Sequence, residues 1–173
     1  EQRAALFGFG SFAQDRIAFY REPFDSSDRF PGNAELFTNS VFWLAGHHDG
    51  RFKAFIAHAG IFNFESAYGA TEEYFFVNHD YEGPYWGKPK PRSYEFSPHL
   101  AVQNWDTPIL IVTGQNDFRI TYTQGLEAFN AAQLHGIPSR LLFFPDESHF
   151  VLKPQNSILW QREFFGWLDK WLK

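Results

Sequence analysis

Two residues with complementary acid–base chemistry follow two short apolar segments in the second half of the chain. Asp117 comes just after the run Ile109–Val112 and its closing Gly114, and His149 comes just after the run Leu141–Phe144. A carboxylate beside an imidazole fixes the tautomer of the ring and leaves its other nitrogen free to act as a general base. The pair would therefore supply two of the three parts of a nucleophile, base and orienting-acid constellation.

The elements around this pair would bring it to one place. Apolar runs this short are typical of strands that are buried on both faces, as in a parallel sheet covered by helices. The segment Thr121–His135 between them has helical periodicity and ends at Gly136, followed by Pro138. Chemistry in open α/β sheets gathers just outside the carboxyl ends of the strands. An Asp and a His at strand ends are also common as structural residues, but the combined pattern favours a catalytic pair.

The rest of residues 40–173 shows the same alternation of predicted strands and helices. Ser40–Gly46 resembles the end of a helix, Ala54–Ala59 a strand, and Ser97–Gln103 a short helix that begins at a Ser-Pro pair. The last predicted helix, Asn156–Leu172, carries a stripe of large aromatic residues at helical spacing: Trp160, Phe164, Trp167 and Trp171. A stripe this wide indicates a helix packed against a sheet. Alternation of strands and helices predicts an α/β fold with a parallel sheet.

Residues 1–39 differ from residues 40–173. Arg16–Arg21 alternates like a half-exposed strand, Glu22–Asn33 is rich in turn residues, and Ala34–Thr38 could form a second strand. No segment here has helical periodicity. We therefore divide the chain into an N-terminal β segment, expected to be antiparallel, and an α/β part.

Composition excludes several classes of function. The chain has 173 residues, of which 44% are hydrophobic and 20% aromatic, so it can form a core and is not intrinsically disordered. A net charge of −5 without a basic cluster argues against nucleic acid or an anionic membrane as a partner. No apolar run approaches the length that crosses a bilayer. The absence of cysteine excludes disulfides, thiol catalysis and thiolate metal sites.

The remaining histidines show no metal-binding pattern. His47 and His48 are adjacent in a predicted turn and are expected to be solvated, and no H-E-x-x-H motif is present. His58, at the end of a predicted strand, fits either a core position or a pocket wall. We expect neither a metal nor a cofactor.

The segments S-P-H-L-A-V-Q-N-W-D-T-P-I-L-I-V-T-G-Q-N-D-F-R-I and F-F-P-D-E-S-H-F resemble the C-terminal catalytic part of the prolyl oligopeptidase family of serine peptidases. W-L-A-G-H-H-D-G-R-F-K-A-F-I-A-H-A-G and the ending F-F-G-W-L-D-K-W-L-K look most like the dipeptidyl peptidase V group of bacteria. The resemblance covers Ser40–Lys173. It implies an α/β-hydrolase fold over this part, and it likens the strands of the N-terminal segment to those of a β-propeller.

Carried over by resemblance, Asp117 corresponds to the acid and His149 to the base of a Ser-His-Asp triad. The order Ser, Asp, His along the chain is that of α/β-hydrolases. Arg119 and Ile120 match positions that line the specificity pocket of the family. In the family, the loop after the strand that ends at Gly60 also lines this pocket, and the resemblance therefore adds Phe62 and Phe64 as substrate-binding residues. An aromatic lining would favour apolar side chains beside the bond that is cut.

The nucleophile of the family has no counterpart in this sequence. No G-x-S-x-G motif occurs, and counting back from S-V-F-W-L-A-G places the expected serine near Glu35. Ser40 is a poor substitute because no strand–turn–helix elbow precedes it. We interpret the sequence as pieces of a longer peptidase with a break near 38–40, and we expect the 173 residues alone to be inactive, since removing a triad serine costs on the order of 10⁶ in turnover.

The resemblance implies a serine peptidase that releases N-terminal dipeptides with apolar penultimate residues from peptide substrates. Two alternatives stay open: an acylaminoacyl peptidase or esterase of the same fold, and a catalytically inactive hydrolase-like binding module. The resemblance also leaves a homodimer open and suggests a periplasmic or secreted protein.

Overall fold

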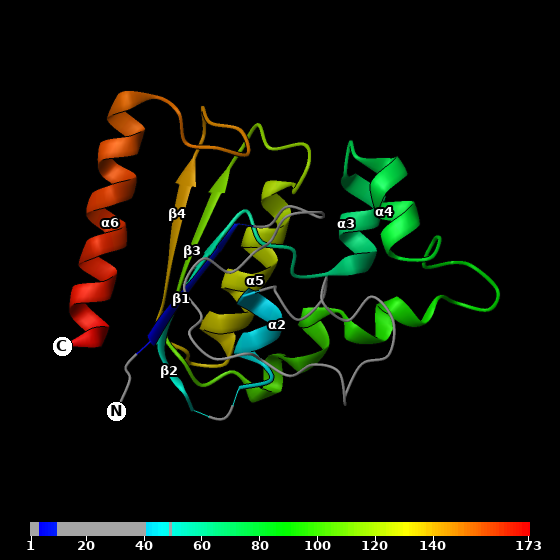
Figure 1. Ribbon diagram of the computed structural model, residues 1–173, viewed down its shortest axis with the longest axis horizontal. Coiled ribbons are helices and arrows are strands. Elements are labelled where there is room, and N and C mark those ends of the chain that lie inside the picture. The colour runs from blue at the N-terminus through cyan, green and yellow to red at the C-terminus, as the bar shows by residue number, and fades with distance from the viewer. Residues whose placement is uncertain (1–3, 10–40, 49) are drawn as a thin grey trace.

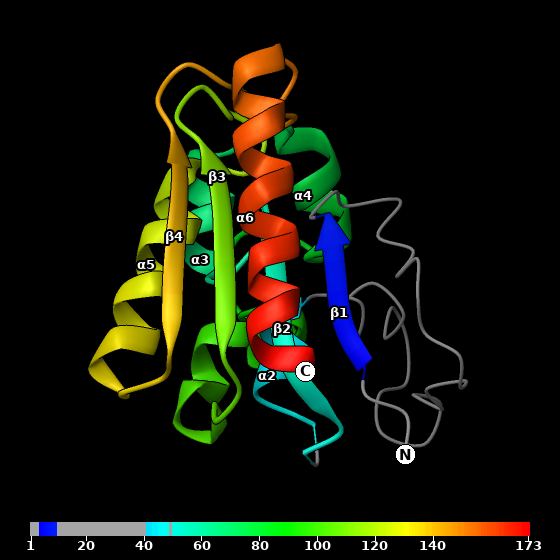
Figure 2. The ribbon, with the colours of Figure 1, turned by 90° about the vertical axis from the view of Figure 1, so that its left-hand side faces the viewer.

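The computed structural model describes residues 4–9, 41–48 and 50–173, and its centre is a parallel β-sheet. Its four strands lie in the order in which they occur along the chain: β1 (Ala4–Phe9), β2 (Phe52–His58), β3 (Ile109–Gly114) and β4 (Ser139–Phe144). Every neighbouring pair is parallel, so all strands end at one edge of the sheet (Figures 1 and 2). The predicted α/β class and the strands predicted from the three apolar runs are confirmed.

Helices connect these strands. The described α-helices are α2 (Val41–Ala45), α3 (Phe64–Ala70), α4 (Tyr74–Asp80), α5 (Tyr122–Leu134) and α6 (Pro154–Leu172), and the 3₁₀ segments are η1 (Arg92–Phe96) and η2 (Pro98–Asn104). The prediction placed α5 and α6 correctly and found the end of α2 at Gly46 and the start of η2. It did not resolve α3, because the segment between β2 and η1 is aromatic throughout and has no clear period.

Side chains that alternate along the strands build a core on each face of the sheet. Phe55 and Ala57 of β2 pack on the face covered by α2 and α5, whereas Ala54 and Ile56 pack toward α6. Figure 2 shows α6 lying across one face of the sheet, with α5 and α2 behind the sheet. This period of two, with both faces buried, explains why β2 and β3 read as nearly continuous apolar runs.

Helix α6 contacts the sheet through the aromatic stripe that the sequence predicts. Trp167 is buried, and Trp160, Phe164 and Trp171 pack around it. Other large apolar residues of the same helix are only partly covered, since Ile158 and Phe165 each expose 60% of their surface. The helix therefore buries a narrower arc than its sequence suggests.

The N-terminal part is described only at β1, which is parallel to β2 and extends the same sheet. The sequence did not predict this strand. The predicted hairpin strands Arg16–Arg21 and Ala34–Thr38, their antiparallel pairing, their likeness to a propeller and the break near 38–40 all lie outside the described residues.

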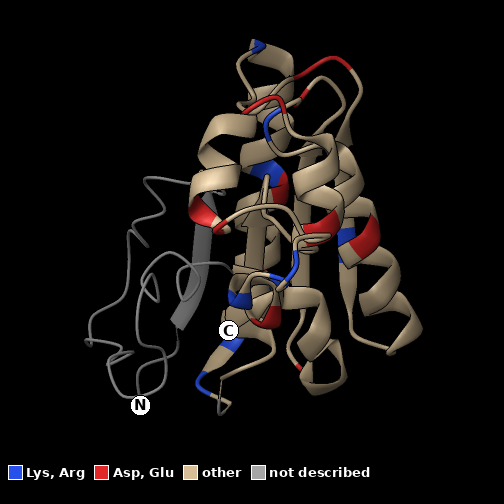
Figure 3. Cartoon of the chain, turned by 90° about the vertical axis from the view of Figure 1, so that its right-hand side faces the viewer, with Lys and Arg blue, Asp and Glu red and all other residues tan. Residues whose placement is uncertain are grey.

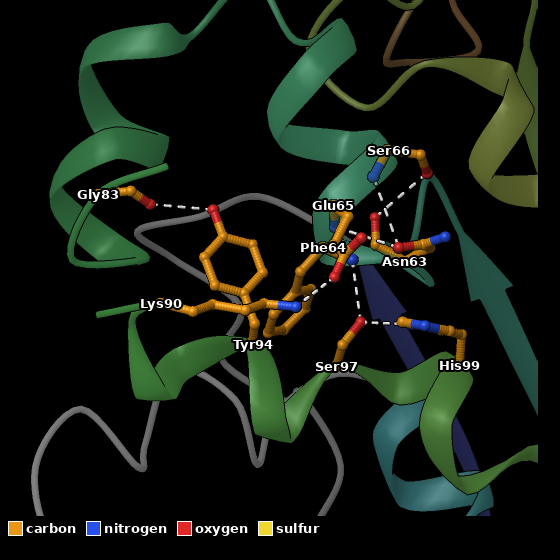
Figure 4. A network of polar contacts seen from close by, with 9 residues as sticks. All are labelled: Asn63, Phe64, Glu65, Ser66, Gly83, Lys90, Tyr94, Ser97 and His99. Carbon is orange, nitrogen blue, oxygen red and sulfur yellow. Dashed lines mark hydrogen bonds and ion pairs between the residues drawn. The ribbon is translucent and has the colours of Figure 1, made fainter. Parts of the chain in front are cut away.

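A polar network fastens α3 onto η2 (Figure 4). The Ser97 hydroxyl accepts a hydrogen bond from the backbone N–H of Phe64 (2.9 Å) and lies 2.7 Å from Nδ1 of His99. The Asn63 side chain caps α3 by accepting from the N–H groups of Glu65 and Ser66. Because Ser97 is buried and satisfied by these contacts, we interpret this serine–histidine contact as structural.

Candidate active site

Asp117 lies in a tight turn just beyond the carboxyl end of β3. Its Oδ1 accepts hydrogen bonds from the backbone N–H groups of Arg119 (3.0 Å) and Ile120 (2.9 Å), and its own N–H bonds to the carbonyl of Gly114 (3.2 Å). Two backbone donors stabilise the ionised carboxylate and fix its orientation. Its second oxygen, Oδ2, is left to contact another group.

That group is His149. Nδ1 of the imidazole lies 2.9 Å from Oδ2 of Asp117, and the two side chains expose 8% and 0% of their surface. Since an ionised carboxylate only accepts, Nδ1 is the donor in this contact, and Nε2 keeps its lone pair whenever the ring is neutral. Nε2 is buried and has no hydrogen-bond partner among the described residues. The arrangement can hold a general base in a fixed tautomer.

The two loops that carry this pair are packed backbone against backbone. The N–H of Asn116 donates to the carbonyl of Glu147 (2.9 Å), and the N–H of Gln115 donates to that of Phe144 (2.8 Å). A Cβ at Gly114 would lie 2.3 Å from the carbonyl oxygen of Ser148 and 2.7 Å from that of Glu147. A side chain at this position has no room, so glycine is required for the loops to meet.

A second imidazole is buried beside the pair. His58 ends β2, next to Val112 of β3, and exposes 2% of its surface. Burial, and to a lesser degree the nearby His149, lower its pKa to about 4, and Asp117 partly opposes this shift. His58 is therefore neutral at pH 7, and it occupies a core position in which its ring lies beside Trp160 of α6, with 6.1 Å between ring centroids.

The four residues predicted to bind substrate occupy different environments. Phe62 and Phe64 are buried in two hydrophobic clusters, where Phe64 stacks on Tyr81. Ile120 is also buried, in the cluster formed around α3 and α4. Arg119 is partly exposed and forms an ion pair with Glu73 (2.8 Å), at the N-cap of α4. Their assignment to substrate binding stays a prediction.

Sequence reasoning missed two aromatic residues that directly follow the acid and the base. Phe118 exposes 61% of its surface, and Phe150 exposes 50% while its ring packs edge-on against His149, with 4.9 Å between ring centroids. The carbonyl of Phe118 also accepts from the N–H of Glu72. This bond joins the loop that carries Asp117, called the acid loop below, to the start of α4. The sequence could have pointed to both residues, because each directly follows Asp117 or His149 in the motifs N-D-F and S-H-F.

The adjacent histidines of the predicted turn have different environments. His47 is exposed, but the His48 side chain exposes only 1% of its surface, so the expectation that it is solvated was wrong. Its ring is covered by Phe52 and Phe55. In the part of the chain that the structure describes, no three His, Cys, Asp or Glu side chains gather as they would around a metal ion.

Charge and helix length add two observations. Figure 3 shows acidic and basic residues interspersed along the described elements rather than gathered into blocks of one sign. Among the described helices, none combines the length and the apolar character of a membrane span.

A parallel sheet with an Asp after one strand and a His after the next is the arrangement of the α/β-hydrolase class. The chain belongs to the prolyl oligopeptidase family, whose family model matches residues 39–173. It is 55% identical over 157 residues to dipeptidyl-peptidase 5 of Porphyromonas gingivalis (88% of this chain, 23% of the relative). It is 57% identical over 137 residues to dipeptidyl-peptidase 5 of Porphyromonas endodontalis (78% and 20%). The predicted family and group are confirmed, and the chain spans about a fifth of the length of these relatives.

Solved structures agree on the fold. The chain resembles the acylaminoacyl peptidase of Pyrococcus horikoshii with a TM-score of 0.68 at 19% identity, over 76% of this chain and 22% of that one. It resembles a puromycin-hydrolyzing peptidase of Mycobacterium tuberculosis with a TM-score of 0.64 at 24% identity, over 75% and 20%. At these identities the likeness concerns the fold alone.

Proposed function

We propose that the protein containing this chain is a serine peptidase that releases dipeptides from the free N-termini of peptides, with Asp117 and His149 as two members of its triad. The observation that carries the proposal is the 2.9 Å contact between Oδ2 of Asp117 and Nδ1 of His149, with Nε2 unengaged among the described residues. The 55–57% identity to two relatives called dipeptidyl-peptidase 5 supports the choice of reaction.

In this mechanism Nε2 of His149 removes the proton from a serine hydroxyl as the oxygen attacks the carbonyl carbon of the second residue of the substrate. The imidazolium then gives that proton to the leaving amine, and an acyl-enzyme remains. In the second half of the reaction the same nitrogen activates water, which releases the dipeptide and restores the serine. Asp117 stays ionised throughout and stabilises the imidazolium. We place the serine in a part of the protein outside the described residues.

We further propose a preference for an apolar penultimate residue. Phe118 and Phe150 support it, because each directly follows a triad residue and presents an aromatic surface. Phe62 and Phe64 support it less, since the cores around them already cover both rings.

The test uses the full-length protein and dipeptidyl chromogenic substrates with free and acetylated N-termini. We expect cleavage of the free form only, and a fall in kcat on the order of 10⁶ for His149→Ala. Equal turnover of the acetylated substrate would favour an acylaminoacyl peptidase. No turnover, together with no labelling by a fluorophosphonate, would favour an inactive binding module.

A further inference from the structure

Glu147, in the motif P-D-E-S-H-F, is an ionisable side chain close to the site that the mechanism does not use. The residue exposes only 4% of its surface. A carboxylate is costly to bury unless it is hydrogen-bonded or paired, so its partners indicate what it does.

The partners are three N–H donors that lie beyond His149 in the sequence. Oε2 of Glu147 accepts from the backbone N–H of Leu152 (3.1 Å), and Oε1 accepts from the backbone N–H of Lys153 (3.0 Å) and from Nδ2 of Asn156 (2.7 Å). Lys153 is the N-cap of α6, whose first N–H groups have no partner within the helix. The carboxylate therefore closes a loop over residues 147–153, with His149 inside it.

The backbone of the same residue contacts the acid loop. The carbonyl of Glu147 accepts from the N–H of Asn116, the residue before Asp117. Glu147 thus joins the acid loop through its backbone and the start of α6 through its side chain, and His149 lies two residues further along.

Its ionisation fits this arrangement. Burial alone would raise the pKa of Glu147, but the hydrogen bonds from Asn156, Leu152 and Lys153 outweigh burial and hold the pKa below its ordinary value. The carboxylate is therefore ionised at neutral pH, when it accepts most strongly from all three donors.

We propose that Glu147 is a positioning residue: its buried carboxylate ties the loop that carries His149 to the start of α6 and so holds the imidazole against Asp117. This inference goes beyond the pairing itself and rests on the proposed function only for its effect on turnover.

The test compares Glu147→Gln with Asp146→Asn in the full-length protein. Glutamine keeps the shape of Glu147 but replaces one acceptor oxygen with an NH₂ group that faces a donor. Asp146 is a matched control, because it lies in the same loop and contacts Lys153 (2.7 Å) and Asn156 (2.9 Å), yet its side chain is 44% exposed.

One readout is the downfield proton NMR signal of the His149 Nδ1–H, identified by its loss in Asp117→Asn and recorded well below the unfolding temperature. We expect Glu147→Gln to broaden or lose this signal and to lower kcat roughly 10- to 100-fold at nearly constant KM, because a small displacement of a catalytic group costs that much. Asp146→Asn should keep the signal and stay within about twofold of the parent kcat.

The proposal is overturned if Glu147→Gln keeps the signal, or if both variants lose it equally. If Glu147→Gln does not fold by circular dichroism, Glu147→Asp takes its place. Its carboxylate is one methylene too short to reach all three donors, so an unchanged His149 signal in that variant also overturns the proposal. If the parent cleaves no peptide while Glu147→Gln still loses the signal, the peptidase assignment fails and the positioning role stands.

Discussion

Two histidine–aspartate pairs lie at opposite ends of the sheet, and they differ in ways that separate the proposed catalytic pair from a structural one. His149 and Asp117 follow the carboxyl ends of β4 and β3, whereas His48 and Asp106 precede the amino ends of β2 and β3. The nitrogen–oxygen distances are similar: 2.9 Å for Nδ1 of His149 and 3.2 Å for Nε2 of His48. Proximity alone therefore does not distinguish the pairs.

The two pairs differ in the burial of their carboxylates and in the contacts of both ring nitrogens. Asp117 is fully buried, while the Asp106 side chain exposes 67% of its surface, so water screens its charge. In His48, Nδ1 accepts from the N–H of Gly50 and Nε2 also lies 3.1 Å from the Thr107 hydroxyl. Both nitrogens are engaged, so His48 has no site at which to take a proton from a substrate.

The largest effect that would sharpen this comparison is expected for Asp117→Asn in the full-length protein. The amide offers the imidazole a donor in place of a carboxylate oxygen, which favours the wrong tautomer and leaves a developing imidazolium unpaired; kcat should fall by about 10⁴. Asp106→Asn should change kcat by less than about twofold. Steady-state kinetics on the same dipeptidyl substrate measure both, and similar losses would mean that the comparison is mistaken.

A second prediction concerns Gly114, which lets the loops that carry Asp117 and His149 meet. Gly114→Ala places a Cβ against the carbonyl oxygens of Ser148 and Glu147, which are backbone atoms and cannot turn aside. We expect the His149 loop to shift and kcat to fall on the order of 10². Gly166→Ala is the control, because nothing lies within 4 Å of a Cβ there. Alanine in place of glycine in a helix interior should stabilise the fold by about 0.5–1 kcal/mol and leave kcat unchanged. Unchanged turnover in Gly114→Ala would show that the loops adjust freely.

The sequence could predict this site because its main determinants are local. Apolar runs locate β3 and β4, and in a parallel sheet that alone brings the residues after them to one edge. The burial of His48 could not be predicted, because it depends on two contacts that the local sequence does not show. Phe52 and Phe55 of β2 pack against its ring, and Thr107, 59 residues away in the chain, contacts Nε2. The role of Phe62 could not be read either, since it depends on contacts with Phe42 and Trp105 from separate elements.

A third prediction uses the buried His58 at the carboxyl end of β2. Its pKa is about 4 in the folded protein and 6.5 in the unfolded chain, so above pH 6.5 it is neutral in both states and its titration has no effect. As the pH falls from 6.5 to 4, only the unfolded chain takes up the proton, and stability drops by at most about 3 kcal/mol. Below pH 4 both states are protonated and the loss stops growing.

Urea unfolding at pH 7 and pH 4.5 measures this loss, with His58→Gln as the variant that cannot titrate. The variant should show a smaller difference between the two pH values than the parent. The same difference in both proteins would mean that other groups cause the acid sensitivity.

The smallest effect is expected at the other pair, where the comparison predicts a loss of stability without a loss of chemistry. His48→Ala leaves the N–H of Gly50 and the hydroxyl of Thr107 without their partner and removes a ring that Phe52 and Phe55 cover. Losing such contacts costs about 1–3 kcal/mol, while kcat should stay within about twofold of the parent. His79→Ala is the matched control, because that side chain is 80% exposed and its removal should change stability by less than about 0.5 kcal/mol. Thermal unfolding and steady-state turnover of the two variants test this prediction. A His48→Ala variant that stays stable but loses activity would contradict it, because the general base would then lie at the amino end of the sheet and not at His149.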